Sequence, residues 1–159
     1  MSTHVLVERL AGSLIATRRM LATAESCTGG MIAARCTDLA GSSRWFDRGF
    51  VTYSNEAKQE LLGVSVATLE RHGAVSAETA AEMAAGALAA SRADLTVAVT
   101  GVAGPSGGSA DKPVGTVWFG FASAAGVETE CVRFAGDRAA VREATVVHAL
   151  DRLIGIAGG

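Results

Sequence analysis

Residues 41–58 read GSSRWFDRGFVTYSNEAK and carry the chain from a predicted strand into a predicted helix. The apolar run Phe50–Tyr53 is typical of a strand. Ser54 follows it as a helix N-cap, because its hydroxyl can accept a hydrogen bond from a free N–H group of the first turn. Lys58 then lies near the positive end of the helix dipole, which disfavours a second positive charge. Partial burial would lower the pKa of Lys58 further, since desolvation penalises an ammonium group.

A lysine that is partly neutral can accept a proton from a hydroxyl group. Ser42, Ser43 and Tyr53 provide hydroxyls close to Lys58 in the sequence. The stretch therefore contains the parts of a Ser–Lys nucleophile–base pair. The alternative is a solvated lysine behind a serine-rich turn, which is the commoner fate of these residue types.

The composition favours one cytoplasmic domain over residues 1–159. Charged residues are 19% of the chain and the formal net charge is −2, which argues against a nucleic-acid-binding surface. Three widely spaced cysteines (Cys27, Cys36, Cys131) form no C-x-x-C pair, which favours reduced thiols. Glu8 and Arg9 interrupt the first apolar stretch, so it is neither a signal peptide nor a membrane span.

Periodicity predicts how helices and strands follow one another along the chain. Helical patterns occupy about 5–18, 31–41, 55–62, 66–71, 76–91 and the segment after Asp137. Strand-like runs occupy 20–24, 50–53 and 95–99, and runs 114–123 and 127–134 form a candidate hairpin whose second strand lies nearer an edge. This order predicts a three-layer α/β/α domain with a mixed, mostly parallel sheet.

Two glycine-rich turns follow predicted strands. The first, Glu25–Gly30, reads ESCTGG and opens a helix, so its N–H groups and hydroxyls suit a phosphate or carboxylate; a well-capped helix is the alternative. The second, Thr100–Gly108, lies at the carboxyl end of a buried strand, where open α/β sheets bind ligands. Neither turn has the spacing of a P-loop or a dinucleotide fingerprint.

Three segments in this order resemble the CinA C-terminal domain family, and the resemblance covers nearly the whole chain. They are TAESCTGG (Thr23–Gly30), AGSSRWFDRGFVTYSNEAK (Ala40–Lys58), and VTGVAGPSGG with KPVGTVWFGFA (Val99–Ala122). The resemblance implies an enzyme that hydrolyses the carboxamide of nicotinamide mononucleotide to nicotinate mononucleotide and ammonia. It implies a small-molecule nucleotide substrate. Three scattered histidines without an i, i+4 pair argue against a metal site, and we expect no cofactor and no nucleic-acid or membrane partner. A homo-oligomer, in the simplest case a dimer, is also expected.

The resemblance also implies which residues catalyse the reaction. The family's Ser–Lys pair, assisted by a tyrosine and a threonine, corresponds to Ser43, Lys58, Tyr53 and Thr100. An extended link would hold Ser43 and Lys58 out of reach of each other, so the chain must bend between Arg44 and Gly49, or a second subunit must complete the site. Ser26, on a sharp strand-to-helix turn, is the second candidate nucleophile.

Substrate binding is expected in the two glycine-rich turns. The ribose 5′-phosphate is assigned to the first turn, through Ser26, Thr28, Gly29 and Gly30. Gly101 and Gly104 would let the backbone approach the ligand closely. Cys27 is a third, weaker candidate nucleophile. The rival function is a nucleotide-binding module without catalysis, which would keep both turns but would not need Lys58.

Overall fold

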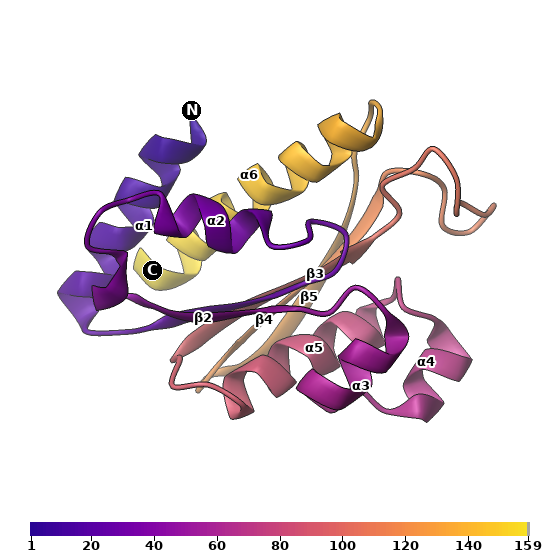
Figure 1. Ribbon diagram of the computed structural model, residues 1–159, viewed down its shortest axis with the longest axis horizontal. Helices are drawn as coiled ribbons and strands as arrows, with labels where there is room; N and C mark the ends of the chain where they lie inside the picture. The colour runs from indigo at the N-terminus through magenta and orange to yellow at the C-terminus, as the bar shows by residue number, and fades with distance from the viewer. Residues whose placement is uncertain (159) are drawn as a thin grey trace.

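The computed structural model describes residues 1–158 and has one five-stranded sheet with helices on both faces (Figure 1). The strands lie in the order β2-β1-β3-β4-β5. They are β1 (Leu21–Glu25), β2 (Phe46–Val51), β3 (Leu95–Gly101), β4 (Thr116–Ser123) and β5 (Gly126–Arg133). Strands β2 and β3 both pair with β1 in parallel, and β4 runs antiparallel to its neighbours β3 and β5. The predicted three-layer α/β/α fold with a mixed sheet is confirmed.

Helices divide between the two faces of the sheet (Figure 1). On one face lie α1 (Thr3–Thr17), α2 (Met31–Thr37) and α6 (Arg138–Gly158), and on the other lie α3 (Asn55–Leu62), α4 (Val66–His72) and α5 (Ala77–Ala89). A short 3-10 turn, η1 (Ser42–Arg44), precedes β2. None of the helices in this described part of the chain is long and apolar enough to cross a membrane.

Each face of the sheet has its own hydrophobic core. Large side chains such as Leu10, Phe119 and Leu150 fill the core beneath α1 and α6. The core beneath α5 is built from smaller residues such as Ala84 and Ala98. Small residues bring α5 very close to the sheet: a Cβ atom on Gly120 of β4 would lie only 2.4 Å from the carbonyl oxygen of Ala80.

The helix starts that the sequence predicts are confirmed by their capping bonds. The Ser54 hydroxyl accepts from the Ala57 N–H at 3.0 Å and the Asp137 carboxylate accepts from the Ala140 N–H at 2.9 Å. The strand predicted at 50–53 is misplaced, because β2 spans Phe46–Val51. This strand lies at an edge of the sheet, where Asp47 and Arg48 can sit beside solvent, so an apolar run does not mark its extent.

The two connections that lead from β1 to β2 and from β2 to β3 lie on opposite faces of the sheet. Helix α2 connects β1 to β2 on one face, whereas α3, α4 and α5 connect β2 to β3 on the other face. Such a switch point leaves a crevice outside the carboxyl ends of the strands, where α/β proteins bind ligands. Ser26 follows β1, Thr52 follows β2 and Thr100 is near the end of β3, so all three lie at this edge.

Candidate active site

Lys58 is the centre of the candidate site, and its side chain is almost completely buried. Its exposed fraction is 1%, and its Nζ atom lies 2.9 Å from the Ser26 hydroxyl oxygen, 2.8 Å from the Thr52 carbonyl oxygen and 3.0 Å from the Tyr53 carbonyl oxygen. Burial lowers the pKa of Lys58 from 10.5 to about 8, although the nearby Cys27 acts in the opposite direction. The predicted depression of the lysine pKa thus agrees with the position of this side chain.

A neutral amine can satisfy all three contacts. A neutral lysine has two N–H donors and one lone pair, whereas its three neighbours are two carbonyl oxygens and one hydroxyl. The carbonyls of Thr52 and Tyr53 can only accept hydrogen bonds, so they take both N–H groups. The lone pair is then left to face the hydroxyl of Ser26, which is the geometry of a base poised to deprotonate a nucleophile.

Ser26 is held at the bend between β1 and α2. Its N–H donates to the carbonyl of Val99 in β3 at 3.0 Å, and its carbonyl accepts from the Gly29 N–H at 3.1 Å. The turn needs glycine, because Gly29 and Gly30 have φ angles of 58° and 103°, in the left-handed region. The serine side chain is 8% exposed and borders a cavity of about 230 Å³ together with Lys58 and Thr100.

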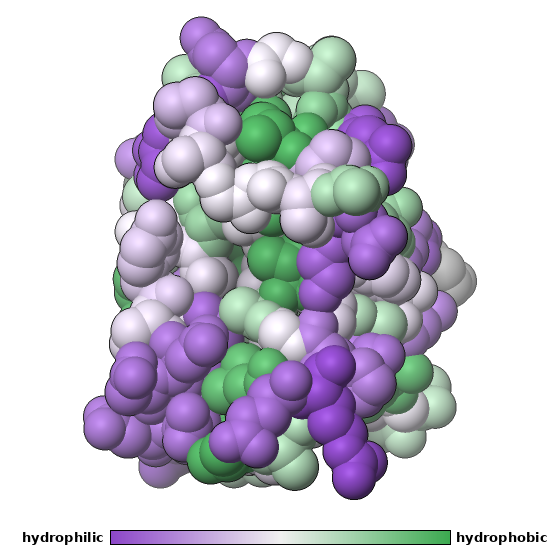
Figure 2. Space-filling model, turned by 90° about the vertical axis from the view of Figure 1, so that its right-hand side faces the viewer, coloured by the Kyte–Doolittle hydropathy of each residue, from purple (hydrophilic) through white to green (hydrophobic). Residues whose placement is uncertain are grey.

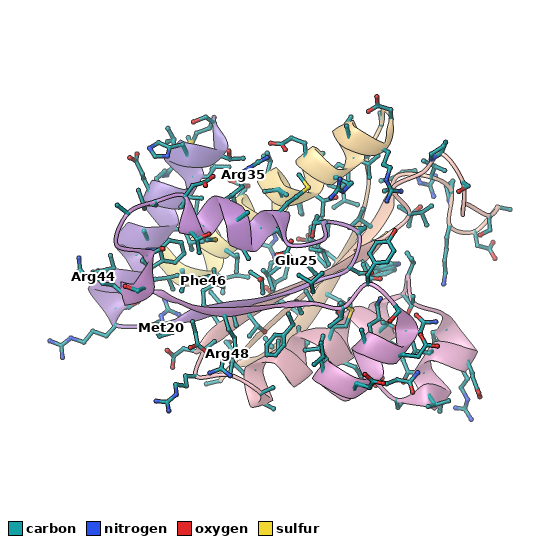
Figure 3. All side chains as sticks on the ribbon, in the orientation of Figure 1. Met20, Glu25, Arg35, Arg44, Phe46 and Arg48 are labelled. Atoms are coloured by element: carbon teal, nitrogen blue, oxygen red, sulfur yellow. The ribbon has the colours of Figure 1, made fainter. Side chains whose placement is uncertain are left out.

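Glu25, the last residue of β1, fixes the turn from inside the protein. Figure 3 shows Glu25 between the sheet and the first turn of α2. Its fully buried carboxylate accepts from the N–H groups of Ile32 and Ala33 at 2.9 and 3.0 Å, and from the Thr28 hydroxyl at 2.6 Å. A carboxylate at the start of a helix also interacts favourably with the helix dipole. The alternative of a well-capped helix, left open for this turn, is therefore what the structure contains.

The expected contact between Ser43 and Lys58 does not occur within the chain. Ser43 belongs to η1 and is exposed, at the end of the sheet where β2 begins, whereas Lys58 follows the end of β2. At ~3.3 Å per residue, the six residues of β2 alone span roughly 17–20 Å. Figure 3 shows Arg44, the neighbour of Ser43, at the opposite end of the sheet from Glu25. The geometry thus favours Ser26, the second candidate nucleophile.

The proposed phosphate site in the first turn is also corrected. Thr28 is fully buried and its hydroxyl donates to Glu25, so it is not accessible to a ligand. The N–H groups of Ile32 and Ala33 are likewise taken by Glu25. An internal carboxylate therefore occupies the place at the helix start that an external phosphate was expected to fill. Gly29 and Gly30 shape the turn by their backbone conformation.

Tyr53 and Thr100 do lie at the cavity, with contacts that differ from the expected ones. The Tyr53 carbonyl, not its hydroxyl, contacts Lys58, and the hydroxyl of this 62% exposed side chain accepts from Arg138 at 3.3 Å. The Thr100 hydroxyl donates to the Ala74 carbonyl at 2.8 Å and so joins β3 to the loop before α5. Both residues line the cavity, and neither touches the Ser26 hydroxyl.

The second glycine-rich turn contributes backbone to the site. Gly101 lines the cavity and packs against β4, because a Cβ atom there would lie 2.8 Å from the Thr116 carbonyl oxygen. Gly104 has a φ angle of 84°, and its carbonyl accepts a hydrogen bond from Arg138 at 2.8 Å. Close approach of the backbone therefore occurs at both glycines, toward neighbouring parts of the protein.

Sequence reasoning missed two arginines of α6, Arg138 and Arg142. Arg138 lines the cavity beside Ser26 and Lys58, and Arg142 donates to the carbonyls of Cys27 and Thr28 at 3.0 and 3.2 Å. They occur four positions apart just after the recognised cap Asp137, so they share one face of the helix. That spacing could have indicated a pair of arginines that act together. The sequence does not indicate, however, that α6 lies beside the end of β1.

Cys27 does not have the properties of a nucleophile. Its side chain is 6% exposed, and burial raises the pKa of the thiol to about 11. The thiol therefore stays protonated at neutral pH, and only the thiolate would be reactive.

Comparisons with known proteins identify the family of the chain. The family model described as the CinA C-terminal domain matches residues 3–156. Nicotinamide-nucleotide amidohydrolase PncC from Enterobacter agglomerans is 58% identical over 149 residues, covering 93% of this chain and 91% of that protein. The same-named protein from Escherichia coli strain K12 is 55% identical over 151 residues, covering 93% and 90%. The crystal structure of competence/damage inducible protein CihA from Agrobacterium tumefaciens has a TM-score of 0.94 at 48% identity and covers 98% of this chain and 99% of that one.

Proposed function

Because the chain belongs to the CinA C-terminal domain family, we propose that Ser26 and Lys58 are its nucleophile and base in the hydrolysis of a nicotinamide nucleotide. The protein is an amidohydrolase of the kind its relatives represent, nicotinamide-nucleotide amidohydrolases that share more than half of its residues. The observation that supports the roles of the two residues is the buried amine of Lys58, with two carbonyl acceptors and one hydroxyl around it.

The reaction begins when neutral Lys58 accepts the proton of the Ser26 hydroxyl. The serine oxygen attacks the carboxamide carbon of nicotinamide mononucleotide and forms a tetrahedral oxyanion. The Cys27 N–H follows the nucleophile directly at the border of the cavity and donates to no backbone acceptor in the described chain, so we assign it to the oxyanion. Lys58 then returns its proton to the departing nitrogen, which leaves as ammonia.

The second half of the reaction removes the acyl group. Water attacks the ester formed on Ser26 while Lys58 accepts a proton from that water. The ester bond breaks, the serine oxygen takes back the proton, and nicotinate mononucleotide leaves. Both residues belong to the same chain, so the nucleophile and base do not need a second subunit to meet. A dimer remains a prediction.

The test compares two serines that were competing candidates. Ammonia release from nicotinamide mononucleotide is measured for the wild type, Ser26→Ala and Ser43→Ala. We expect Ser26→Ala to lower kcat by more than about a thousandfold, because removing a nucleophile removes the covalent route. Ser43→Ala, an exposed serine at the other end of the sheet, is the matched control and should stay within about twofold of wild type.

Two outcomes would contradict the proposal. An active Ser26→Ala enzyme with an inactive Ser43→Ala enzyme would restore Ser43 as the nucleophile and require a second subunit. If the wild type binds the nucleotide but releases no ammonia, the protein is the rival nucleotide-binding module.

A further inference from the structure

A second cavity adjoins the one that contains Ser26 and Lys58. It measures about 700 Å³ and lies between the glycine-rich loop after β3 and the first turns of α6. Ala103 and Arg138 border both cavities, so the two lie side by side. Figure 2 views the molecule from this end, and apolar atoms are visible in the recessed middle of the face with hydrophilic side chains around them.

The smaller cavity is below the usual size of a complete site for a small molecule. Sites for small molecules usually measure roughly 300–1,000 Å³, whereas the cavity at Ser26 measures about 230 Å³. It is large enough for the ring that carries the carboxamide. The ribose and phosphate of a mononucleotide then have to extend past Ala103 and Arg138 into the larger cavity.

Two arginines line that larger cavity, and both have unused donors. Arg138 donates one N–H to the Gly104 carbonyl and one to the Tyr53 hydroxyl. Arg142 donates one to the Cys27 carbonyl and one to the Thr28 carbonyl. All four acceptors are neutral, and a guanidinium group has five N–H donors.

Neither guanidinium has a carboxylate partner within residues 1–158. The arginine ion pairs in this part of the chain are formed by Arg35, Arg48 and Arg152. Asp137 does border the cavity, but it caps α6 by accepting from the Ala140 N–H. Two positive charges against one engaged carboxylate leave an excess of positive charge here, because the first turn of α6 has no acidic residue and the Glu143 carboxylate in its second turn pairs with Arg35.

We propose that Arg138 and Arg142 bind the 5′-phosphate of the mononucleotide in this second cavity. The inference rests on the proposed function, because it takes the nucleotide as substrate. Arginine suits the role, since its planar group can form two parallel hydrogen bonds with a phosphate. The assignment replaces the turn after β1, where Glu25 already occupies the helix start.

The test compares nicotinamide mononucleotide with nicotinamide riboside, which lacks the phosphate. Values of kcat/KM for both substrates are measured for the wild type, Arg138→Ala and Arg142→Ala. We expect each variant to reduce the ratio of the two values by about ten- to hundredfold, mainly through KM for the mononucleotide. Arg152→Ala is the matched control, an arginine on the same helix that pairs with Glu130, and should leave the ratio unchanged.

Arg142→Ala also removes two bonds to the catalytic turn, so its result needs a second variant. Arg138 does not touch Cys27 or Thr28, and Arg138→Ala therefore separates phosphate binding from support of the turn. Equal losses on both substrates in Arg138→Ala would overturn the proposal, and so would a wild type that does not distinguish the two substrates.

Binding measurements keep the inference testable if the enzyme releases no ammonia. The Ser26→Ala protein is titrated calorimetrically with the mononucleotide, the riboside and inorganic phosphate. We expect the mononucleotide to bind at least tenfold more tightly than the riboside, and Arg138→Ala in this background to remove most of the difference. If the difference persists, the phosphate is bound elsewhere even though the nucleotide is the ligand.

Discussion

Lys58 must be neutral to act as a base, and its surroundings favour that state. Its amine is buried, and none of its three hydrogen-bonding neighbours is a carboxylate that would stabilise the ammonium form. The position near the start of α3 adds the unfavourable field of the helix dipole. Burial is the largest cause of the pKa reduction to about 8.

The pH dependence of activity follows from this residue. Below about pH 8 the amine is protonated and cannot accept the serine proton, so we expect kcat/KM to fall about tenfold per pH unit on the acidic side. Activity should rise through that value and then level off. Lys58→Arg should be inactive at every pH, because a guanidinium group stays protonated in proteins. Steady-state ammonia release from pH 6 to 10 measures both effects, and an active Lys58→Arg enzyme would show that the proton acceptor is another group.

For single residues, the sequence predicted local properties correctly, but it did not predict which residues lie close together in space. The cap at Ser54 and the low pKa of Lys58 follow from residue types within a few positions of each other. The hydroxyl that contacts Lys58 could not be predicted in this way, because proximity in the sequence favoured Ser43. The true neighbour Ser26 is thirty-two positions away and meets Lys58 only because β1 and β2 end at the same edge of the sheet.

The element that supports the proposed nucleophile is α2, and the buried carboxylate of Glu25 holds its first turn. Glu25→Gln replaces one acceptor oxygen with an amide group that cannot accept the N–H of Ile32 or Ala33. We expect a loss of about 2–4 kcal/mol in the free energy of unfolding, since a buried donor is left unpaired and charge-assisted bonds are lost. Urea unfolding measures the loss. Glu56→Gln, an exposed glutamate in the first turn of α3, should change it by less than about 0.5 kcal/mol, and equal effects would contradict the role of Glu25.

Helix α5 provides a second test at the scale of elements, through its packing on α3. A Cβ atom on Gly86 would lie 1.9 Å from the Leu62 carbonyl oxygen at the end of α3. Gly86→Ala should therefore destabilise the fold by about 1–3 kcal/mol, although alanine is the better helix former. Gly12→Ala in α1 meets nothing within 4 Å and should stabilise it by about 0.5–1 kcal/mol. Thermal and urea unfolding of both variants give the comparison, and a stabilising Gly86→Ala would contradict the close packing.

Elements were easiest to predict where their faces are buried uniformly. Strand β3 is buried at every position but its last because helices cover both sides of it, and it was predicted to within two residues. Strand β2 was misplaced because an edge strand carries charged residues in its middle. The glycines that let α5 approach the sheet and α3 could not be interpreted in advance, since their role depends on which backbone lies opposite.

At the scale of the molecule, the site is made by the topology of the sheet. The carboxyl ends of β1, β2 and β3 meet at one edge, and α6 returns from the far side of the chain to add Arg138 and Arg142. The sequence predicted this architecture, and it predicted that the glycine-rich turns follow strands at the edge to which we assign the ligand. It could not predict that α6 begins beside the carboxyl end of β1, because that contact depends on packing between segments more than one hundred residues apart.

A ligand that fills both cavities should therefore stabilise four distant segments together. We expect hydrogen exchange of the Ser26→Ala protein to slow on binding nicotinamide mononucleotide around residues 26–30, 52–58, 100–104 and 138–142, because their backbones border or support the two cavities. Residues 38–45, which include Ser43, should exchange at the same rate with and without ligand, since they lie at the other end of the sheet. The riboside should protect the first three segments but leave 138–142 less protected, because it lacks the phosphate. Protection centred on residues 38–45 would instead place the substrate at Ser43, and it would contradict the site at the carboxyl ends of the strands.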